Sequence, residues 1–217
     1  MNPYNIYIEG NIASGKSTLI EYLKSELGDK IEFYLEPIDR WKDCKGVNLL
    51  KLMYDDPKQY SFHLQSFIQS TMFEIQINKS KFPIKLTERS LLSERYVFIQ
   101  YLISNKIISD LEFNILNNWF EQLNSLTPKV NEIIYLQTKP EDVFHQLKLR
   151  ARSEEKNITL NYLSDLHNLH EDWLIHQSNG QLNNSLVTVV EQNFVKENTN
   201  LIYNKIVERL KTQLNHV

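Results

Sequence analysis

The stretch Gly10-Asn11-Ile12-Ala13-Ser14-Gly15-Lys16-Ser17, followed by Thr18, decides the fold of this chain. It satisfies the pattern G-x-x-x-x-G-K-[ST], which is typical of a phosphate-binding loop. An apolar run at residues 4–8 precedes it, and residues 18–24 carry apolar side chains at helical spacing. Strand, glycine loop and helix are the three parts of this motif, so the sequence predicts a nucleotide-binding loop over residues 10–18.

The residue types in the loop explain why it would hold phosphates. Glycine permits the backbone angles that turn successive N–H groups toward one anion, and a helix N-terminus adds about half a positive charge. We expect Lys16 to reach the β- and γ-phosphates of ATP and Ser17 to hold Mg²⁺. The alternative is a glycine turn before an amphipathic helix. The chain has 5 glycines, two of them in this loop, which favours nucleotide binding.

Length and composition restrict the class of protein. At 217 residues, the chain is long enough for one α/β domain or two small ones. Its 24 Lys and Arg against 27 Asp and Glu argue against a nucleic-acid or membrane-surface binder. The single cysteine, Cys44, permits no intrachain disulfide and favours a reducing compartment. Because the first strand is expected by Tyr4, we expect no signal or transit peptide and a cytoplasmic location.

Strands alternate with helices along the whole chain. Further strands are expected at residues 31–36, 84–88, 132–137 and 186–190, the last fully buried. Helices are expected at residues 46–54, 59–79, 92–105, 110–126, 140–150, 157–175 and 199–214, with a break at Asn179-Gly180. This alternation predicts an α/β fold with a five-stranded parallel sheet covered by helices on both faces. Since no Gly/Ser/Pro-rich linker divides it, we expect residues 1–217 to form a single domain.

Charged residues follow two of the predicted strands where each strand ends. Glu36 closes the second strand before Pro37, and Glu88-Arg89 closes the third. Ligands bind at this edge of open α/β sheets. Glu36 is therefore a candidate catalytic base, Arg89 a candidate for neutralising developing charge, and Glu88 a candidate for holding a metal-bound water or orienting Lys16. The alternatives are a solvated glutamate before a turn and a local ion pair.

A third charged group occupies residues 150–155, Arg-Ala-Arg-Ser-Glu-Glu. Two arginines, Arg150 and Arg152, on a helix end or loop suit a lid over ATP phosphates, because one guanidinium can bridge two phosphate oxygens. We expect this lid at about residues 148–157. A solvated helix face is the alternative.

The order of these motifs resembles one family. Residues 36–41, 88–90 and 150–155 follow the glycine loop in the order seen in the deoxynucleoside kinase family, and residues 46–50, 64–66 and 166–174 add to the likeness. The likeness is greatest to the insect multisubstrate and mitochondrial thymidine kinase types and covers the chain to about residue 176. It implies a P-loop kinase-like fold and ATP- and Mg²⁺-dependent phosphorylation of the 5′-hydroxyl of deoxyribonucleosides, pyrimidine more than purine. It also implies a homodimer and feedback inhibition by a deoxynucleoside triphosphate.

The resemblance also implies roles for matching residues. Glu36 matches the base for the 5′-hydroxyl, with Arg89 beside it, and Gln65 matches a glutamine that pairs with the nucleobase. Tyr54 and Glu155 match residues that hold the 3′-hydroxyl. Six positions match the apolar lining of the base pocket: Trp41, Leu50, Met53, Ile68, Met72 and Phe98. For these apolar positions, ordinary core packing is the alternative.

Two positions depart from the family pattern. Members that accept purines or favour deoxycytidine tend to pair an arginine at position 72 with an aspartate at position 94, and thymidine-accepting members tend to have methionine and alanine. This chain combines Met72 with Glu94, so Glu94 either binds a base amino group, turns outward or is neutral. Gln146 stands where an additional lid arginine is common, and Lys148 supplies charge but not bidentate geometry.

Two other functions compete with this interpretation. A nucleoside monophosphate kinase of the thymidylate kinase type would need additional cations near its acceptor. A non-catalytic kinase-like subunit would have lost its catalytic set, whereas this chain keeps Lys16, Ser17, Glu36, Arg89 and Arg152.

Overall fold

The computed structural model describes residues 3–177, 185–194 and 196–216, and within them the chain forms a five-stranded parallel sheet. The strands are β1 (Tyr4–Gly10), β2 (Ile31–Tyr34), β3 (Ile84–Glu88), β4 (Glu132–Thr138) and β5 (Leu186–Gln192). Their order across the sheet is β2-β3-β1-β4-β5, so β1 is central. The predicted α/β class and P-loop kinase-like fold are confirmed.

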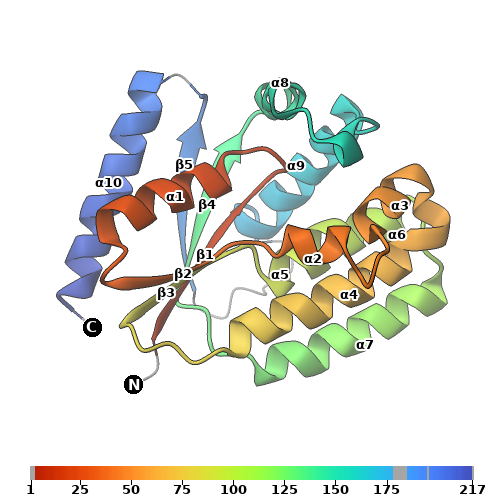
Figure 1. Ribbon diagram of the computed structural model, residues 1–217, viewed down its shortest axis with the longest axis horizontal. Coiled ribbons are helices and arrows are strands. Elements are labelled where there is room, and N and C mark those ends of the chain that lie inside the picture. The colour runs from red at the N-terminus through yellow and green to blue at the C-terminus, as the bar shows by residue number, and fades with distance from the viewer. Residues whose placement is uncertain (1–2, 178–184, 195, 217) are drawn as a thin grey trace.

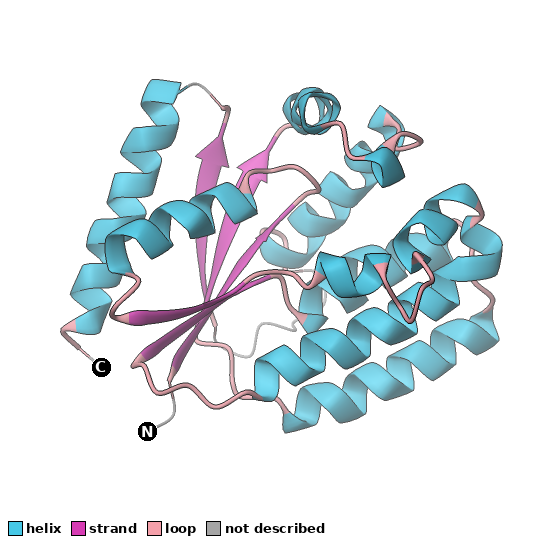
Figure 2. Cartoon of the chain, in the orientation of Figure 1, coloured by secondary structure: helices cyan, strands magenta, loops and turns pink. Residues whose placement is uncertain are grey.

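Helices cover both faces of the sheet (Figures 1 and 2). They are α1 (Lys16–Leu27), α2 (Ile38–Lys42), α3 (Leu49–Asp55), α4 (Pro57–Ile77), α5 (Leu91–Ser93), α6 (Gln100–Ser104), α7 (Asp110–Leu126), α8 (Pro140–Arg150), α9 (Leu160–Leu174) and α10 (Lys196–Leu214). A π-helical turn, η1 (Glu94–Ile99), joins α5 to α6, and a 3₁₀ turn, η2 (Ser153–Glu155), lies between α8 and α9. Helices α1 and α10 pack together on one side of the sheet, as Figure 1 shows.

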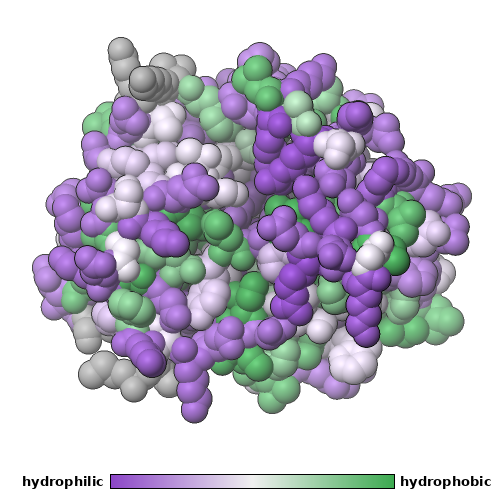
Figure 3. All heavy atoms as spheres, viewed as in Figure 1, coloured by the Kyte–Doolittle hydropathy of each residue, from purple (hydrophilic) through white to green (hydrophobic). Residues whose placement is uncertain are grey.

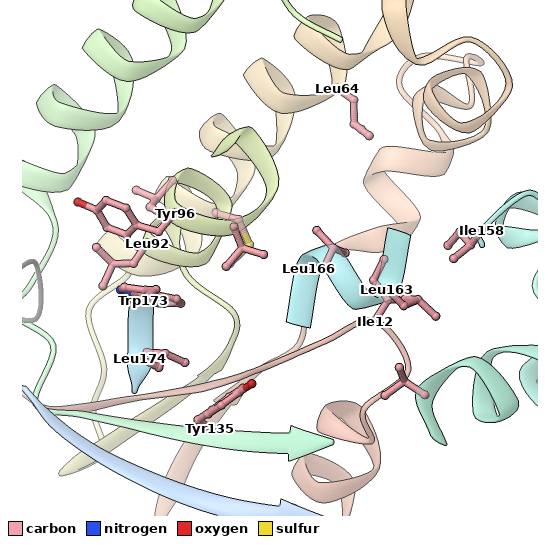
Figure 4. Close-up of a cluster of buried hydrophobic side chains, with 14 of the residues drawn as sticks. Ile12, Leu64, Leu92, Tyr96, Tyr135, Ile158, Leu163, Leu166, Trp173 and Leu174 are labelled. Atoms are coloured by element: carbon pink, nitrogen blue, oxygen red, sulfur yellow. The ribbon is translucent and has the colours of Figure 1, made fainter. Parts of the chain in front are cut away.

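Alternate residues of the central strands feed two separate cores. Ile6 and Ile8 of β1 belong to the cluster that includes α1 and α10. The opposite face packs against α9 and η1, where Tyr135 of β4 and Trp173 of α9 belong to one cluster with Tyr96 (Figure 4). The loop after β1 therefore begins at the centre of the sheet, where the two cores fix the position of the β1 backbone from both faces.

Three features near the site differ from the sequence expectation. Strand β2 ends at Tyr34, two residues early, so Glu36 follows the strand instead of closing it. A short helix, α2, then begins at Ile38. The single helix expected over residues 92–105 is interrupted by η1. The sequence did not predict this turn, because a π-turn leaves the spacing of apolar residues nearly unchanged.

Strand β5 corrects another expectation. It was expected to be fully buried, but Leu186 and Val189 are exposed. The reason is its place in the sheet: β5 pairs with β4 on one side and is an edge strand. The expected break at Asn179-Gly180 lies outside the described residues. Among the residues described, no helix combines the length and apolarity needed to cross a membrane.

A buried lysine anchors the helix that carries much of the acceptor side of the site. Lys85 of β3 donates from Nζ to the carbonyl oxygens of Ile75, Gln76 and Asn78 at 2.7, 3.1 and 2.8 Å. These are carbonyls at the C-terminal end of α4, which the helix itself cannot satisfy. The ammonium group also lies 4.9 Å from the centre of the Tyr34 ring. This contact ties α4 to the sheet.

Substituting Lys85→Met should lower the free energy of unfolding by about 2–3 kcal/mol, because buried carbonyls lose a charged donor while the volume is kept. Urea unfolding followed by circular dichroism measures the loss. The control is Lys81→Met, because Lys81 is exposed in the loop before β3 and should leave stability unchanged. Equal midpoints for the two variants would contradict the anchoring role.

Candidate functional site

A cavity of about 710 Å³ lies at the carboxyl edge of the sheet. It is lined by the loop between β1 and α1, by residues that follow β2 and β3, and by α3, α4, η1 and the segment from α8 to η2. Figure 3 shows the face seen in Figure 1, where hydrophilic side chains surround separate apolar patches. Segments far apart in the sequence thus converge on one enclosed space.

The glycine loop has the backbone that phosphate binding requires. Gly15, the N-cap of α1, has φ +91°, and Gly10 has φ +148°. A Cβ on Gly10 would lie 2.8 Å from the carbonyl oxygen of Leu136 in the neighbouring strand, so no side chain fits there. The loop is also tied to α9, since Asn11 donates from Nδ2 to the Leu163 carbonyl at 2.8 Å. The loop is therefore held rigidly at the sheet edge.

Lys16 is buried at the start of α1 and points back over the loop. Its Nζ donates to the carbonyl oxygens of Gly10 and Asn11 at 3.2 and 2.8 Å. Burial, with Arg89 nearby, lowers the pKa of Lys16 to about 7, while Glu88 and Glu36 act in the opposite direction. A polyanion placed in this loop would stabilise the charged ammonium, so the site favours a phosphate chain.

Ser17 and Glu88 form a pair that fits a magnesium ion. The Ser17 hydroxyl donates to both carboxylate oxygens of Glu88, at 3.0 and 3.1 Å. A hydroxyl and a carboxylate are hard oxygen ligands, and Mg²⁺ on nucleotides typically takes one or two protein oxygens and completes its shell with water and phosphate. The described residues contain no group of three or more His, Cys, Asp or Glu placed to hold a metal by themselves. The pair thus suits an ion that arrives with a nucleotide.

Glu36 and Arg89 meet inside the cavity. Arg89 Nε lies 3.0 Å from Glu36 Oε1, an ion pair that is not aligned as a hydrogen bond. Within the described part of the chain, Nε and Nη1 of Arg89 donate no hydrogen bond. Burial raises the pKa of Glu36; the Arg89 charge opposes this shift, and Glu88 adds to it. A carboxylate with a raised pKa, such as Glu36, is suited to accept a proton. The guanidinium donors of Arg89 beside it are available to stabilise negative charge that develops during a reaction.

The backbone of Arg89 explains why its side chain reaches the cavity. Arg89 has φ +61°, a left-handed conformation that a residue with a long side chain rarely adopts. Its N–H donates to the Ile8 carbonyl at 3.0 Å, and its guanidinium lies 4.8 Å from the centre of the Phe98 ring. The turn after β3 is therefore held on β1 while the charge is stacked on an aromatic ring.

The predicted lid arginines share one carboxylate. Arg150 Nη2 donates to both oxygens of Glu155 at 2.6 and 2.7 Å, and Arg152 Nη1 lies 3.5 Å from Oε1. Helix α8 ends at Arg150 because Ala151 takes a left-handed conformation, which turns the chain back over the cavity. Glu155 is also one of the charges that influence Tyr54. This places the lid beside the side chain expected to hold a sugar hydroxyl.

The other end of the cavity is apolar with two buried polar groups. Gln65, Ile68 and Met72 lie on one face of α4 at i, i+3 and i+7, facing Glu94 and Phe98 of η1 across the cavity. In the described structure, Gln65 Oε1 and both carboxyl oxygens of Glu94 have no hydrogen-bond partner. Burial alone raises the pKa of Glu94 well above its ordinary value. These groups are therefore available to form hydrogen bonds with a polar ligand.

The structure brings most of the sequence-predicted residues to the cavity. Every predicted site residue lines it except Gly10 and Asn11, which begin the loop and are buried. Sequence reasoning missed the following lining residues: Ile38, Leu64, Ser90, Ser93, Leu102, Leu149, Tyr162, Gln192, Phe194, Thr199, Asn200 and Tyr203. Leu64 belongs to the helical stripe of Gln65 and Ile68, a signal that was available. No local pattern marks the lining residues from the end of β5 to the first turns of α10.

Comparison with known proteins agrees with this geometry. The deoxynucleoside kinase family profile matches residues 6–215. Human thymidine kinase 2, a mitochondrial protein by name, is 38% identical over 174 residues, covering 80% of this chain and 65% of that protein. Human deoxycytidine kinase is 33% identical over 198 residues, covering 80% and 76%. Mitochondrial deoxyguanosine kinase of Xenopus laevis is 34% identical over 197 residues, covering 80% and 74%.

The aligned region falls short of the full length of these relatives. It spans 65% of the thymidine kinase 2 proteins of Homo sapiens and Macaca fascicularis, which is less than two thirds. The family match nevertheless includes the loop, both charged strand ends, the lid segment and α10.

Proposed function

This chain belongs to the deoxynucleoside kinase family, and we propose that it transfers the γ-phosphoryl group of ATP to the 5′-hydroxyl of deoxyribonucleosides. One observation carries the proposal: the Glu36–Arg89 pair lies in the same cavity as the Lys16 loop on one side and the Gln65–Glu94 lobe on the other. A phosphate donor and a neutral acceptor therefore have adjoining places, with a base between them.

In the proposed reaction, the charged groups accept a proton or stabilise the transferring phosphoryl group. Glu36 accepts the proton of the 5′-hydroxyl as that oxygen bonds to the γ-phosphorus, and the bond between the γ-phosphorus and the bridging oxygen of ADP breaks. The products are a 5′-monophosphate and ADP, with the proton on Glu36. Arg89 and Lys16 stabilise the charge on the transferring group, and the lid arginines can reach the same phosphates when they leave Glu155.

We propose that ATP brings Mg²⁺, which Ser17 and Glu88 would hold. The ion would neutralise charge on the phosphates.

The acceptor lobe weighs against a nucleoside monophosphate kinase. Its described lining around Gln65, Met72 and Glu94 is neutral or acidic, with no additional cation to receive a phosphate.

The experiment that tests the function is a phosphorylation assay with ATP and Mg²⁺ on thymidine, deoxycytidine, deoxyadenosine, deoxyguanosine and thymidine monophosphate. Turnover of nucleosides is expected, and Glu36→Gln should lower kcat at least about 100-fold with nucleoside binding kept. Glu32→Gln on β2 is the control, since Glu32 does not line the cavity. Turnover of the monophosphate alone, or silence on all five with ATP bound, would overturn the proposal.

For the nucleobase, we propose a pyrimidine, with deoxycytidine ahead of thymidine. Thymidine kinase 2 and deoxycytidine kinase are both named for pyrimidine nucleosides. In this chain, Glu94 is buried beside Met72, and burial raises its pKa well above the ordinary value, which favours the neutral form of the carboxyl group. The 4-amino group of cytosine could donate to the Glu94 carboxyl group in either protonation state, whereas O4 of thymine is only an acceptor and could pair only with the protonated acid.

Glu94→Ala should therefore shift the ratio of kcat/KM values toward thymidine by about tenfold or more, because it removes a carboxyl group that pairs with an amino group in both protonation states and makes room for the methyl group. Steady-state kinetics with both nucleosides measure the ratio. Glu74→Ala, at an exposed position of α4, is the control. An unchanged ratio would mean that Glu94 does not read the base.

For the partner, we propose a second copy of this chain bound through α7. Leu111, Ile115, Trp119 and Leu126 are exposed on α7, and their spacing of 4, 8 and 15 residues from Leu111 places them along one stripe. A contiguous apolar stripe on an outer helix supports an interface between copies.

Trp119→Glu should convert the dimer to a monomer, because a carboxylate would be buried in the apolar contact without a partner. Sedimentation velocity across a range of concentrations distinguishes the two states. Leu201→Glu, at an exposed apolar position of α10, should leave the mass unchanged. A wild-type chain that is monomeric at every concentration would contradict the proposal.

Three further expectations remain part of the proposal. Residues 1–217 act as one kinase domain with the lid at about residues 148–157. A deoxynucleoside triphosphate inhibits by placing its phosphates in the same loop. The single cysteine, half-buried Cys44, favours a reducing compartment, and we propose the cytoplasm.

A further inference from the structure

Glu9 is a fully buried carboxyl group that the proposed reaction does not use. It precedes Gly10 on β1 and pairs in register with Tyr135, whose side chain belongs to the core on the α9 side. Its Oε1 accepts a hydrogen bond from the Ser90 hydroxyl at 2.5 Å. Among the described residues, Oε2 has no hydrogen-bond partner. A buried acid in this state requires a physical reason.

The Ser90 contact connects Glu9 to Arg89. Ser90 is the N-cap of α5 and shares a capping box with Ser93, so its position is fixed. The preceding residue, Arg89, donates its N–H to the Ile8 carbonyl of β1 at 3.0 Å. Two consecutive residues of β1, Ile8 and Glu9, therefore hold two consecutive residues of the turn that places the Arg89 guanidinium. The left-handed backbone of Arg89, at φ +61°, needs such support.

The charges around Glu9 are mostly positive. Arg89 and Lys16 are the cations that act on it, and the Ser90 hydroxyl donates to it. Tyr7, on the same strand, remains a neutral phenol because burial raises its pKa. Burial lowers the pKa of His170, which stacks on Tyr135, well below its ordinary value, so that ring is neutral too.

Proton transfer to Glu36 would change this balance. When Glu36 becomes protonated, the ion pair with Arg89 loses its negative member, while Arg89 and Lys16, which the phosphates of the nucleotide would keep charged, stay buried. Glu88 is engaged with Ser17. Glu9, bonded to Ser90, is a further carboxyl group next to the turn that carries Arg89.

We propose that Glu9 is a positioning residue for the phosphoryl transfer: it holds Arg89 through Ser90 and supplies the buried negative charge that lets Glu36 take up a proton. This inference rests on the proposed function. Burial raises the pKa of Glu9 to about 7, against the effects of Arg89, the two serines and Lys16. Since protonation removes the charge, kcat should fall as the pH drops through about 7.

The test separates charge from packing with two substitutions. Glu9→Gln keeps an acceptor for Ser90 but removes the charge, so Arg89 and Lys16 would hold Glu36 ionised more strongly. We expect kcat to fall about tenfold, KM for the nucleoside to stay within about twofold, and the acid limb of the kcat profile to move to lower pH. Glu9→Asp keeps the charge and should keep the position of the wild-type limb. Glu132→Gln is the control, because Glu132 is a buried carboxylate bonded to Thr188 and Arg209, away from the cavity.

A second measurement does not depend on catalysis. The pKa of Glu36 can be followed by carboxyl ¹³C NMR, assigned with Glu36→Gln, and it should be lower in Glu9→Gln than in the wild-type protein. An unchanged Glu36 pKa would overturn the inference, as would a Glu9→Gln enzyme with wild-type kcat and acid limb. Equal losses in Glu9→Gln and Glu9→Asp with an unmoved limb would show packing alone and would also overturn it. A wild-type protein inactive on every nucleoside would instead overturn the proposed function.

Discussion

Burial of opposite charges at one edge of the sheet is the constraint on which the rest of the structure depends. Lys16 and Arg89 are almost completely buried, and an unpaired ion in such a place costs several kcal/mol. Three carboxyl groups offset these positive charges. Glu36 forms an ion pair with Arg89, Glu88 accepts a hydrogen bond from Ser17, and Glu9 accepts one from Ser90 in the turn after β3. Removing one member leaves the others mismatched, so the cluster is maintained as a unit.

Sheet topology makes this cluster possible. Because all strands run parallel, the residues that follow β1, β2 and β3 arrive at the same edge, although they are separated by dozens of positions in the sequence. β1 lies between β3 and β4, and its loop has room only for glycine at position 10, where the Leu136 backbone approaches. Helix α4 adds the acceptor side and is fastened to the sheet by Lys85. The cavity is thus a consequence of strand order and of two anchoring contacts.

Local patterns predicted much of this and missed what depends on distant contacts. The loop motif, the strand at 84–88 and the helix at 110–126 were predicted as observed, and Ser109 caps that helix with Glu112. The π-turn that aims Glu94 into the cavity has no signature in apolar spacing. Glu9 has no signature in the local sequence, because its partner Ser90 lies 81 positions away. Glu36 lines the cavity, but the strand before it ends earlier than its apolar pattern indicates.

The two ends of the cavity differ in how they can discriminate between ligands. At the phosphate end, charges dominate, and attraction between them acts on any polyanion of suitable shape. At the other end, Gln65 and Glu94, whose neutral form is favoured because burial raises its pKa, offer hydrogen-bonding groups in an apolar wall, where a mismatched partner leaves a buried polar atom unsatisfied. In the proposed reaction, selection of the acceptor therefore depends on hydrogen-bond complementarity, and catalysis on charge. Glu36 and Arg89 lie between the two regions, so a ligand that satisfies the neutral end is the one presented to the charged end.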